Sequence, residues 1–62
     1  MEDLRENVKK LRKKQGWTQE DLAYRLGVSL STVQRWESKG GKPTQLARRA
    51  LEKLFNKHGI AN

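Results

Sequence analysis

The chain has 62 residues, which suits one small domain with one modest core. Its 14 Lys and Arg residues outnumber 7 Asp and Glu residues, and the resulting charge of +7 favours a polyanionic partner, either nucleic acid or an anionic membrane surface. The absence of cysteine excludes disulfides and thiolate metal sites. No apolar run suits a signal peptide or a membrane span, so we expect a cytoplasmic protein.

The first helix is expected over residues 3–15. Asp3 and Glu6 have the spacing of a capping box, in which each side chain serves the other's backbone N–H. Apolar residues recur on one side at Leu4, Val8 and Leu11. Gly16 then offers the left-handed residue that commonly closes a helix. Most of the lysines near this end are interpreted as a solvated face that complements the helix dipole.

Two short helices are expected next, over residues 18–26 and 29–38. Thr18 and Asp21 have capping-box spacing, and Ser29 is expected to cap the second of these helices. Only Gly27 and Val28 separate the two helices, a connection too tight for an antiparallel hairpin. They must therefore cross steeply, with the small Ala23 at the contact, as in a helix-turn-helix.

The last helix is expected over residues 44–58, beginning at Thr44 after the only proline. Its apolar residues form one predicted stripe of Leu46, Ala50 and Leu54, widened by Ala47, Leu51 and Phe55. After Gly59, Ile60 has the position to fold back on Phe55 in a Schellman motif.

These elements predict an all-α fold, a compact bundle of four or five helices in a single domain over residues 1–62. The helix-turn-helix unit is expected over residues 18–38. The predicted core consists of Val8, Leu11, Leu22, Ala23, Leu26, Val33, Trp36, Leu46, Ala50 and Leu54.

The segment TQEDLAYRLGVSLSTVQRWESKGGKPT, residues 18–44, resembles the helix-turn-helix of the phage repressor and Cro-type (XRE) family. The resemblance extends over about residues 4–55 and departs from the usual family pattern at residues 39–41. It implies a lambda-repressor-like fold and sequence-specific binding of double-stranded DNA by a transcriptional repressor or regulator. It also implies a palindromic operator, occupied by a weak homodimer.

The bases are expected to be contacted from the third helix. At about 100° per residue, Leu30, Ser31, Gln34 and Arg35 share the face opposite Val33 and Trp36. Gln34 suits adenine, Arg35 suits guanine or a phosphate, and Ser31 suits either base edge. Leu30 is equally consistent with incidental surface and with contact to a thymine methyl group. In the family, base-contacting positions are similar to Leu30, Ser31 and Arg35.

Phosphate contacts are expected beside this helix. The resemblance makes Gln19 a phosphate ligand, and a helix N-terminus suits an anion. Lys39 and Lys42 lie beside a glycine pair and complete the basic part of the set. The other expected phosphate contacts are Thr18, Ser29 and Thr32. The resemblance also implies that Arg12 and Glu37 form a structural ion pair between the first and third helices.

Other function classes find less support. The only histidine, His58, has no assigned partner, the acids lack metal-binding spacing, and GGKPT lacks the strand and glycine of a phosphate loop. We therefore expect no enzyme activity, cofactor, metal or small-molecule ligand. Apolar residues spread over four helices argue against a membrane-surface peptide. Two alternatives stay open: an antitoxin-type DNA-binding protein with a protein partner, and a basic protein-interaction module without sequence-specific DNA binding.

Overall fold

A computed structural model of the chain describes residues 4–60. Within this range it contains four α-helices and no strand: α1 (Leu4–Gln15), α2 (Gln19–Leu26), α3 (Leu30–Ser38) and α4 (Gln45–Lys57). The expected all-α class is therefore confirmed, and the predicted helix ends agree closely with the observed ones. The predicted cap at Asp3 lies outside the described residues.

Side-chain caps begin three of the helices. Asp21 N–H donates to Thr18 Oγ1 at 3.0 Å, and Thr18 N–H donates to the Asp21 carboxylate at 2.9 Å, which completes the predicted capping box of α2. The hydroxyls of Ser29 and Thr44 each accept the backbone N–H three residues later, at the starts of α3 and α4. These bonds satisfy N–H groups that have no acceptor within their own helix.

Glycines close the helices as predicted. At the end of α4, Gly59 has a φ of 71°, and Ile60 N–H donates to the Phe55 carbonyl at 2.8 Å. This is the Schellman arrangement, and it brings the buried Ile60 side chain onto the last turn of α4. Equivalent backbone bonds close α1 at Gly16 and α2 at Gly27.

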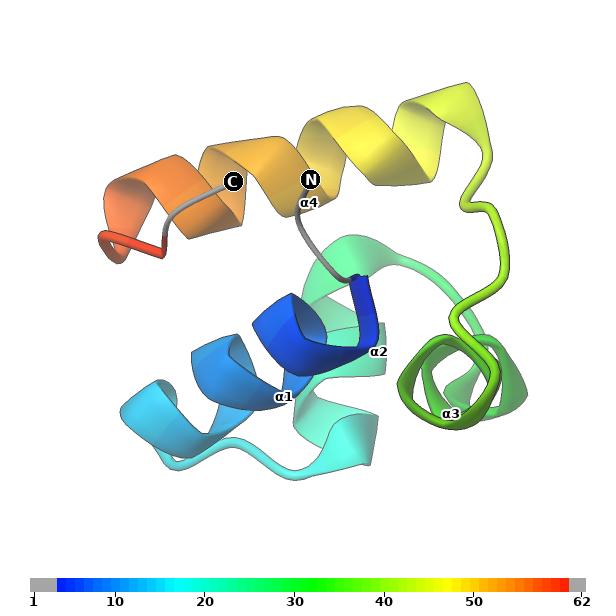
Figure 1. Cartoon of the computed structure of the whole chain (residues 1–62), viewed down its shortest axis with the longest axis horizontal. Helices are drawn as coiled ribbons and strands as arrows, with labels where there is room; N and C mark the ends of the chain where they lie inside the picture. The colour runs from blue at the N-terminus through cyan, green and yellow to red at the C-terminus, as the bar shows by residue number, and fades with distance from the viewer. Residues whose placement is uncertain (1–3, 61–62) are drawn as a thin grey trace.

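The core lies between the four helices. In Figure 1, α3 is seen end-on whereas α1 and α4 are seen from the side, so α3 points across them. Val33 is fully buried and Leu30 is 37% exposed, which confirms the predicted register of α3. The largest fully buried side chain is that of Trp36. The buried apolar residues are Val8, Leu11, Leu22, Ala23, Val33, Trp36, Ala47, Leu51, Phe55 and Ile60.

The predicted register of α4 was wrong. Leu46 is 81% exposed, whereas the buried stripe consists of Ala47, Leu51 and Phe55. Three further predicted core residues, Leu26, Ala50 and Leu54, are only partly buried. The physical reason is apolar area: the stripe that contains Phe55 also receives Ile60 from the Schellman turn, so burying it removes more apolar surface from water.

Two polar atoms are also buried in the helical core. Asn7 Nδ2 and Trp36 Nε1 have no hydrogen-bond acceptor among the described residues. Asn7 was absent from the predicted core, although it lies one position before Val8 on the inner side of α1. An unpaired buried donor lowers stability, so neither atom contributes to holding the fold together.

Candidate nucleic-acid interface

One side of α3 faces away from the core. Leu30, Ser31, Gln34 and Arg35 are all exposed, whereas Val33 and Trp36 are buried on the opposite side. The structure thus gathers the four predicted base-contacting residues on one surface, which we call the exposed face of α3. Its members offer a hydroxyl, an amide, a guanidinium and an apolar group, the chemistry that base edges in a major groove can pair with.

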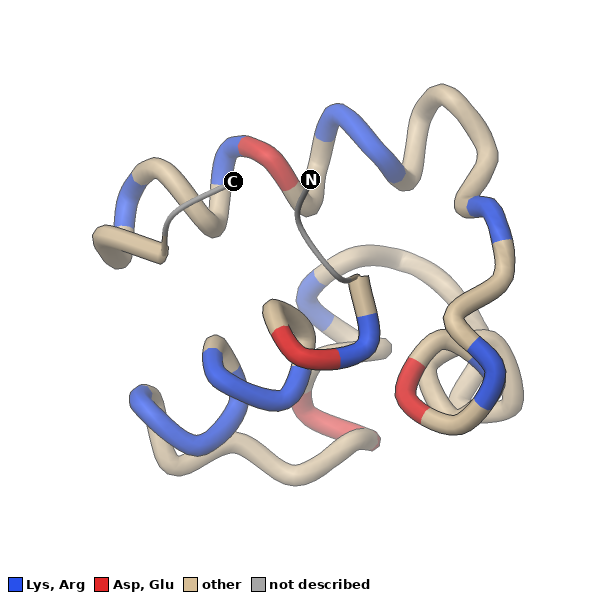
Figure 2. The backbone as a smooth tube through the Cα atoms, in the orientation of Figure 1, with Lys and Arg blue, Asp and Glu red and all other residues tan. Residues whose placement is uncertain are grey.

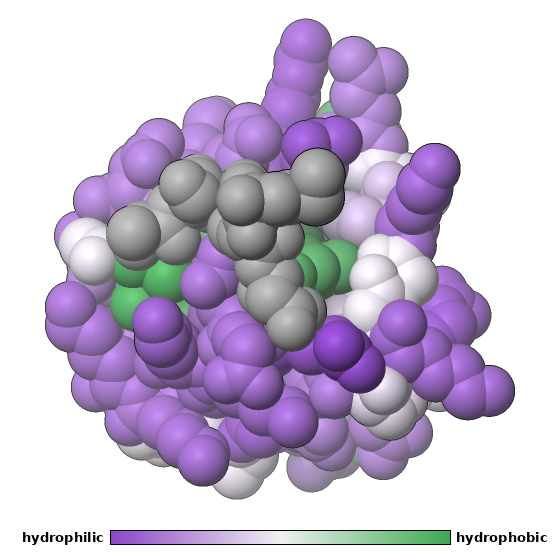
Figure 3. Space-filling model, viewed as in Figure 1, coloured by the Kyte–Doolittle hydropathy of each residue, from purple (hydrophilic) through white to green (hydrophobic). Residues whose placement is uncertain are grey.

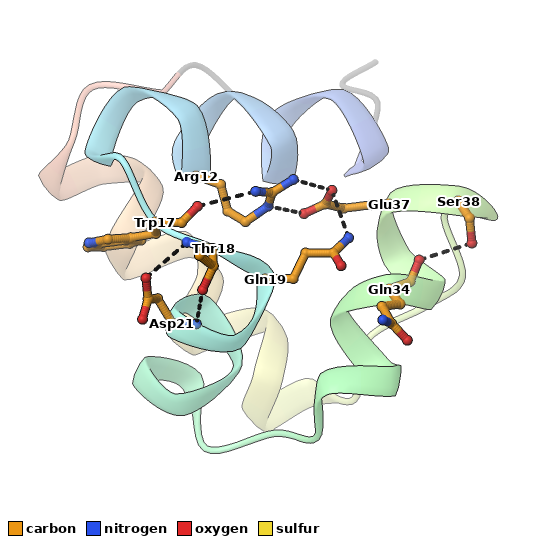
Figure 4. A network of polar contacts seen from close by, with 8 residues as sticks. All are labelled: Arg12, Trp17, Thr18, Gln19, Asp21, Gln34, Glu37 and Ser38. Carbon is orange, nitrogen blue, oxygen red and sulfur yellow. Dashed lines mark hydrogen bonds and ion pairs between the residues drawn. The ribbon is translucent and has the colours of Figure 1, made fainter.

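Ser38 extends this face by one turn and was missed by the sequence analysis. It is exposed and follows Ser31 by two helical turns. Its hydroxyl donates to the Gln34 carbonyl at 2.9 Å, as Figure 4 shows. The spacing of Ser31, Gln34 and Ser38 was the signal that could have revealed it.

The side chain of Arg35 runs beside the loop that follows α3. A Cβ atom at Gly41 would lie 3.8 Å from Arg35 Nε, and one at Gly40 would lie 3.2 Å from Arg5 Cγ. The loop therefore passes close to arginine side chains from α1 and α3. A side chain at Gly41 would meet Arg35 only at ordinary van der Waals distance, whereas the φ of 74° at Gly40 is one that glycine adopts without strain. Lys39 and Lys42 are exposed at the two sides of this glycine pair.

The predicted hydroxyl ligands cluster at the start of α3. Ser29 Oγ lies 2.8 Å from Thr32 Oγ1 and 3.1 Å from Ser31 Oγ. Ser29 also accepts the Thr32 N–H, so its hydroxyl oxygen caps the helix. Thr18 occupies the same capping role at the start of α2. The hydroxyls of Thr18 and Ser29 therefore act as helix caps, and the Thr32 hydroxyl is hydrogen-bonded to that of Ser29.

Arg12 and Glu37 contact each other between α1 and α3. Arg12 Nη2 donates to Glu37 Oε1 at 2.7 Å and Arg12 Nε donates to Oε2 at 2.5 Å, a two-point pairing. Gln19 Nε2 donates to Glu37 Oε1 at 3.2 Å, so the predicted phosphate ligand is held by the same carboxylate. Figure 4 shows this carboxylate between the side chains of Arg12 and Gln19.

The surroundings of Glu37 keep it ionised. Burial raises the pKa of Glu37, but the hydrogen bonds from Arg12 and Gln19 and the charges of Arg12 and Lys9 outweigh burial, so the pKa is lowered from its ordinary value. The hydrogen bond to Glu37 raises the pKa of Arg12. Lys9 of α1 thus lies near enough to act electrostatically on the Glu37 carboxylate.

Positive charge is spread over the surface. Figure 2 shows Lys and Arg along α1, along α4 and in the loop between α3 and α4, and Figure 3 shows a mostly hydrophilic face. Among residues 4–60 there is no group of three or more His, Cys, Asp or Glu side chains that could hold a metal ion. None of the described helices is long and apolar enough to cross a membrane.

Comparisons with known proteins agree with this geometry. A family model described as "Helix-turn-helix" matches residues 8–59, which is most of the chain and includes α2, α3 and the turn between them. No curated protein and no solved structure matches the chain significantly.

Proposed function

The chain belongs to the XRE-type helix-turn-helix family of DNA-binding domains, and we propose that it binds double-stranded DNA sequence-specifically as a transcriptional repressor or regulator. In this proposal residues 18–38 are the helix-turn-helix unit, and α3 enters the major groove. The observation that carries the proposal is the two-sided character of α3. One side is fixed in the core by Val33 and Trp36, and the other presents polar side chains to solvent.

The exposed face of α3 supplies the proposed base contacts. Gln34 pairs with adenine through its amide, and Arg35 pairs with guanine through two guanidinium N–H groups. Ser31 donates to or accepts from either base edge, and Leu30 packs on a thymine methyl group. Each of these four side chains is exposed in the free protein, so no core residue has to move to reach the bases.

Phosphates are contacted on both sides of α3 in this proposal. Gln19 and Thr18 take a phosphate at the start of α2, and Ser29 and Thr32 take one at the start of α3. Lys39 and Lys42 take phosphates at the loop after α3, where both are exposed. Contacts of this kind fix the register of a protein on the duplex and contribute affinity to every sequence.

Selection from a library of random duplexes, followed by titration of the enriched duplex across a salt series, tests the proposal. We expect enrichment of one sequence and a log–log salt slope of about 0.9 per phosphate neutralised. A library that stays random would reject sequence specificity. A flat salt response would reject the phosphate contacts and with them DNA binding by this surface.

We further propose that the protein binds a palindromic operator as a weak homodimer. The exposed Leu46 on α4 supports this, because it leaves an apolar side chain outside the core, beside Gln45 and Arg49. Copies on half-sites about 34–36 Å apart would meet on one side of the duplex. Sedimentation with the selected duplex decides it: one protein per palindromic duplex at saturation would reject the dimer.

A further inference from the structure

One carboxylate joins three helices next to the proposed DNA surface. Glu37 lies near the end of α3 and accepts hydrogen bonds from Arg12 of α1 and from Gln19, the first residue of α2. Its side chain is 4% exposed, whereas that of Arg12 is 19% exposed. Arg12 Nη1 also donates to the Trp17 carbonyl at 3.2 Å, which fixes the guanidinium against the chain just before α2.

The position of this carboxylate is unfavourable for DNA binding if only its charge is considered. A buried anion beside a phosphate-binding surface repels phosphate, and its two-point pairing with Arg12 offsets that repulsion. The charge of Lys9 acts on the same carboxylate. The pair is thus close to neutral, and what remains distinctive about Glu37 is the oxygen that Gln19 donates to.

We propose that Glu37 is a positioning residue for DNA binding, which holds the side-chain amide of Gln19 ready for a phosphate. A primary amide has two N–H donors, so the bond to Glu37 leaves one for the phosphate. An amide that is held before DNA arrives loses less rotamer freedom on binding. This inference rests on the proposed function and adds a role for Glu37 beyond tying α1 to α3.

Two matched double variants separate the role of the oxygen from that of the charge. Arg12→Met/Glu37→Met and Arg12→Met/Glu37→Gln each remove one cation and one anion, so both keep the net charge of +7. Replacing both members of a buried ion pair by apolar residues of similar volume is often neutral or stabilising. Only the variant with glutamine keeps an oxygen that can accept from Gln19.

Affinity for the selected duplex is measured for each background with and without Gln19→Ala. We expect Gln19→Ala to weaken binding about tenfold in the unchanged protein and in the Glu37→Gln background, the effect of one hydrogen bond to a charged group. The double variant Arg12→Met/Glu37→Met should itself bind the duplex about fivefold more weakly than the unchanged protein. Adding Gln19→Ala to it should weaken binding by less than about twofold. Equal penalties in all three backgrounds, or no penalty in the unchanged protein, would overturn the inference.

A second measurement needs no variant. In the free protein, ¹⁵N relaxation of the Gln19 side-chain NH₂ group reports whether the amide is held, and we expect an order parameter above about 0.6, the level below which a group counts as flexible. A value below about 0.6 would overturn the positioning role. Failure of the unchanged protein to select or bind any duplex would instead reject the proposed function, so the two failures are distinguishable.

Discussion

The helices α3 and α4 each bury three side chains but are held in different ways. In α3 these are Val33, Trp36 and Glu37, and in α4 they are Ala47, Leu51 and Phe55. The Glu37 carboxylate fixes α3 with directional hydrogen bonds from α1 and α2. In α4 the buried set is wholly apolar, and burial of apolar area has no preferred direction. The helix proposed to contact DNA is therefore the one whose rotation about its own axis is fixed by hydrogen-bond geometry.

The solvent-exposed side chains of the two helices also differ. The exposed face of α3 carries three polar side chains and Leu30, which is 37% exposed, whereas α4 exposes Leu46 at 81% and an ion pair between Arg48 and Glu52. That pair joins Arg48 Nε to Glu52 Oε2 at 3.6 Å, and both side chains are more than half exposed. Solvent screens such a pair strongly. The contrast between a buried and an exposed ion pair can be measured directly, as can the contrast between Leu51 and Leu46.

The largest expected effect is on the apolar side of α4. Leu51→Ala should lower the free energy of unfolding by about 4 kcal/mol, within the range for leucines buried in a core, because Leu51 is 1% exposed. Leu46→Ala should change it by less than about 0.5 kcal/mol, because Leu46 is 81% exposed. Urea unfolding followed by tryptophan fluorescence measures both, and a larger loss for Leu46→Ala would mean that the register of α4 is wrong.

The next largest effect on stability is expected at Glu37, the buried polar residue of α3. Glu37→Ala leaves the Arg12 guanidinium without its partner, and we expect a loss of about 3 kcal/mol in the free energy of unfolding, the low end for a broken buried pair because Arg12 keeps some exposure. Glu52→Ala breaks the exposed pair of α4 and should cost less than about 0.5 kcal/mol. Similar losses in the two variants would show that burying the ion pair of Glu37 does not increase its contribution to the free energy of unfolding.

The same contrast explains what the sequence could predict. In α3, polar residues surround Val33, and Trp36 alone among the other apolar residues shares its side of the helix, so the register was predicted correctly although Leu30 is also apolar. In α4, apolar residues come in adjacent pairs, such as Leu46 with Ala47, and either stripe satisfies helical periodicity. The choice depends on how Phe55 and Ile60 pack against the rest of the molecule.

The candidate site also contains features that could be predicted from the sequence and features that could not. Its exposed residues follow from position on one helix, so Leu30, Ser31, Gln34 and Arg35 were predictable as a surface. The bond between Gln19 and Glu37 was not, because it joins residues 18 positions apart through a glutamine rotamer. Spacing along one helix cannot specify such a contact, which depends on how α2 crosses α3. The burial of Asn7 is a tertiary result of the same kind.

A third prediction tests the exposed face of α3 against the loop before α4. Arg35→Ala should cost about 1–3 kcal/mol of binding free energy on the selected duplex and relax the preference at one base pair. Lys42→Ala should weaken all duplexes alike and reduce the salt slope by about one phosphate. Titration against the selected duplex and its single-base variants measures both. If Arg35→Ala weakened every duplex equally, Arg35 would be a phosphate contact, a role open to it because its side chain runs beside Gly41.

The smallest expected effect is the loss of stability in acid that comes from protonation of the Glu37 carboxylate of α3. The pKa of Glu37 is lowered in the folded protein, so the unfolded chain binds the proton more readily and protonation favours unfolding. The contribution of Glu37 is complete above its ordinary pKa of 4.5 and is lost as the pH falls through the lower, folded-state pKa. Glu37→Gln should therefore reduce the decrease in the free energy of unfolding below about pH 4.5, measured by urea unfolding across a pH series.

Part of this decrease should persist in Glu37→Gln, because backbone and side-chain hydrogen bonds with Thr18 lower the pKa of Asp21 as well. An unchanged pH profile in Glu37→Gln would mean that the bonds from Arg12 and Gln19 do not favour the ionised carboxylate in the folded protein, and the directional bonds that distinguish α3 from α4 would then contribute no acid-sensitive stability.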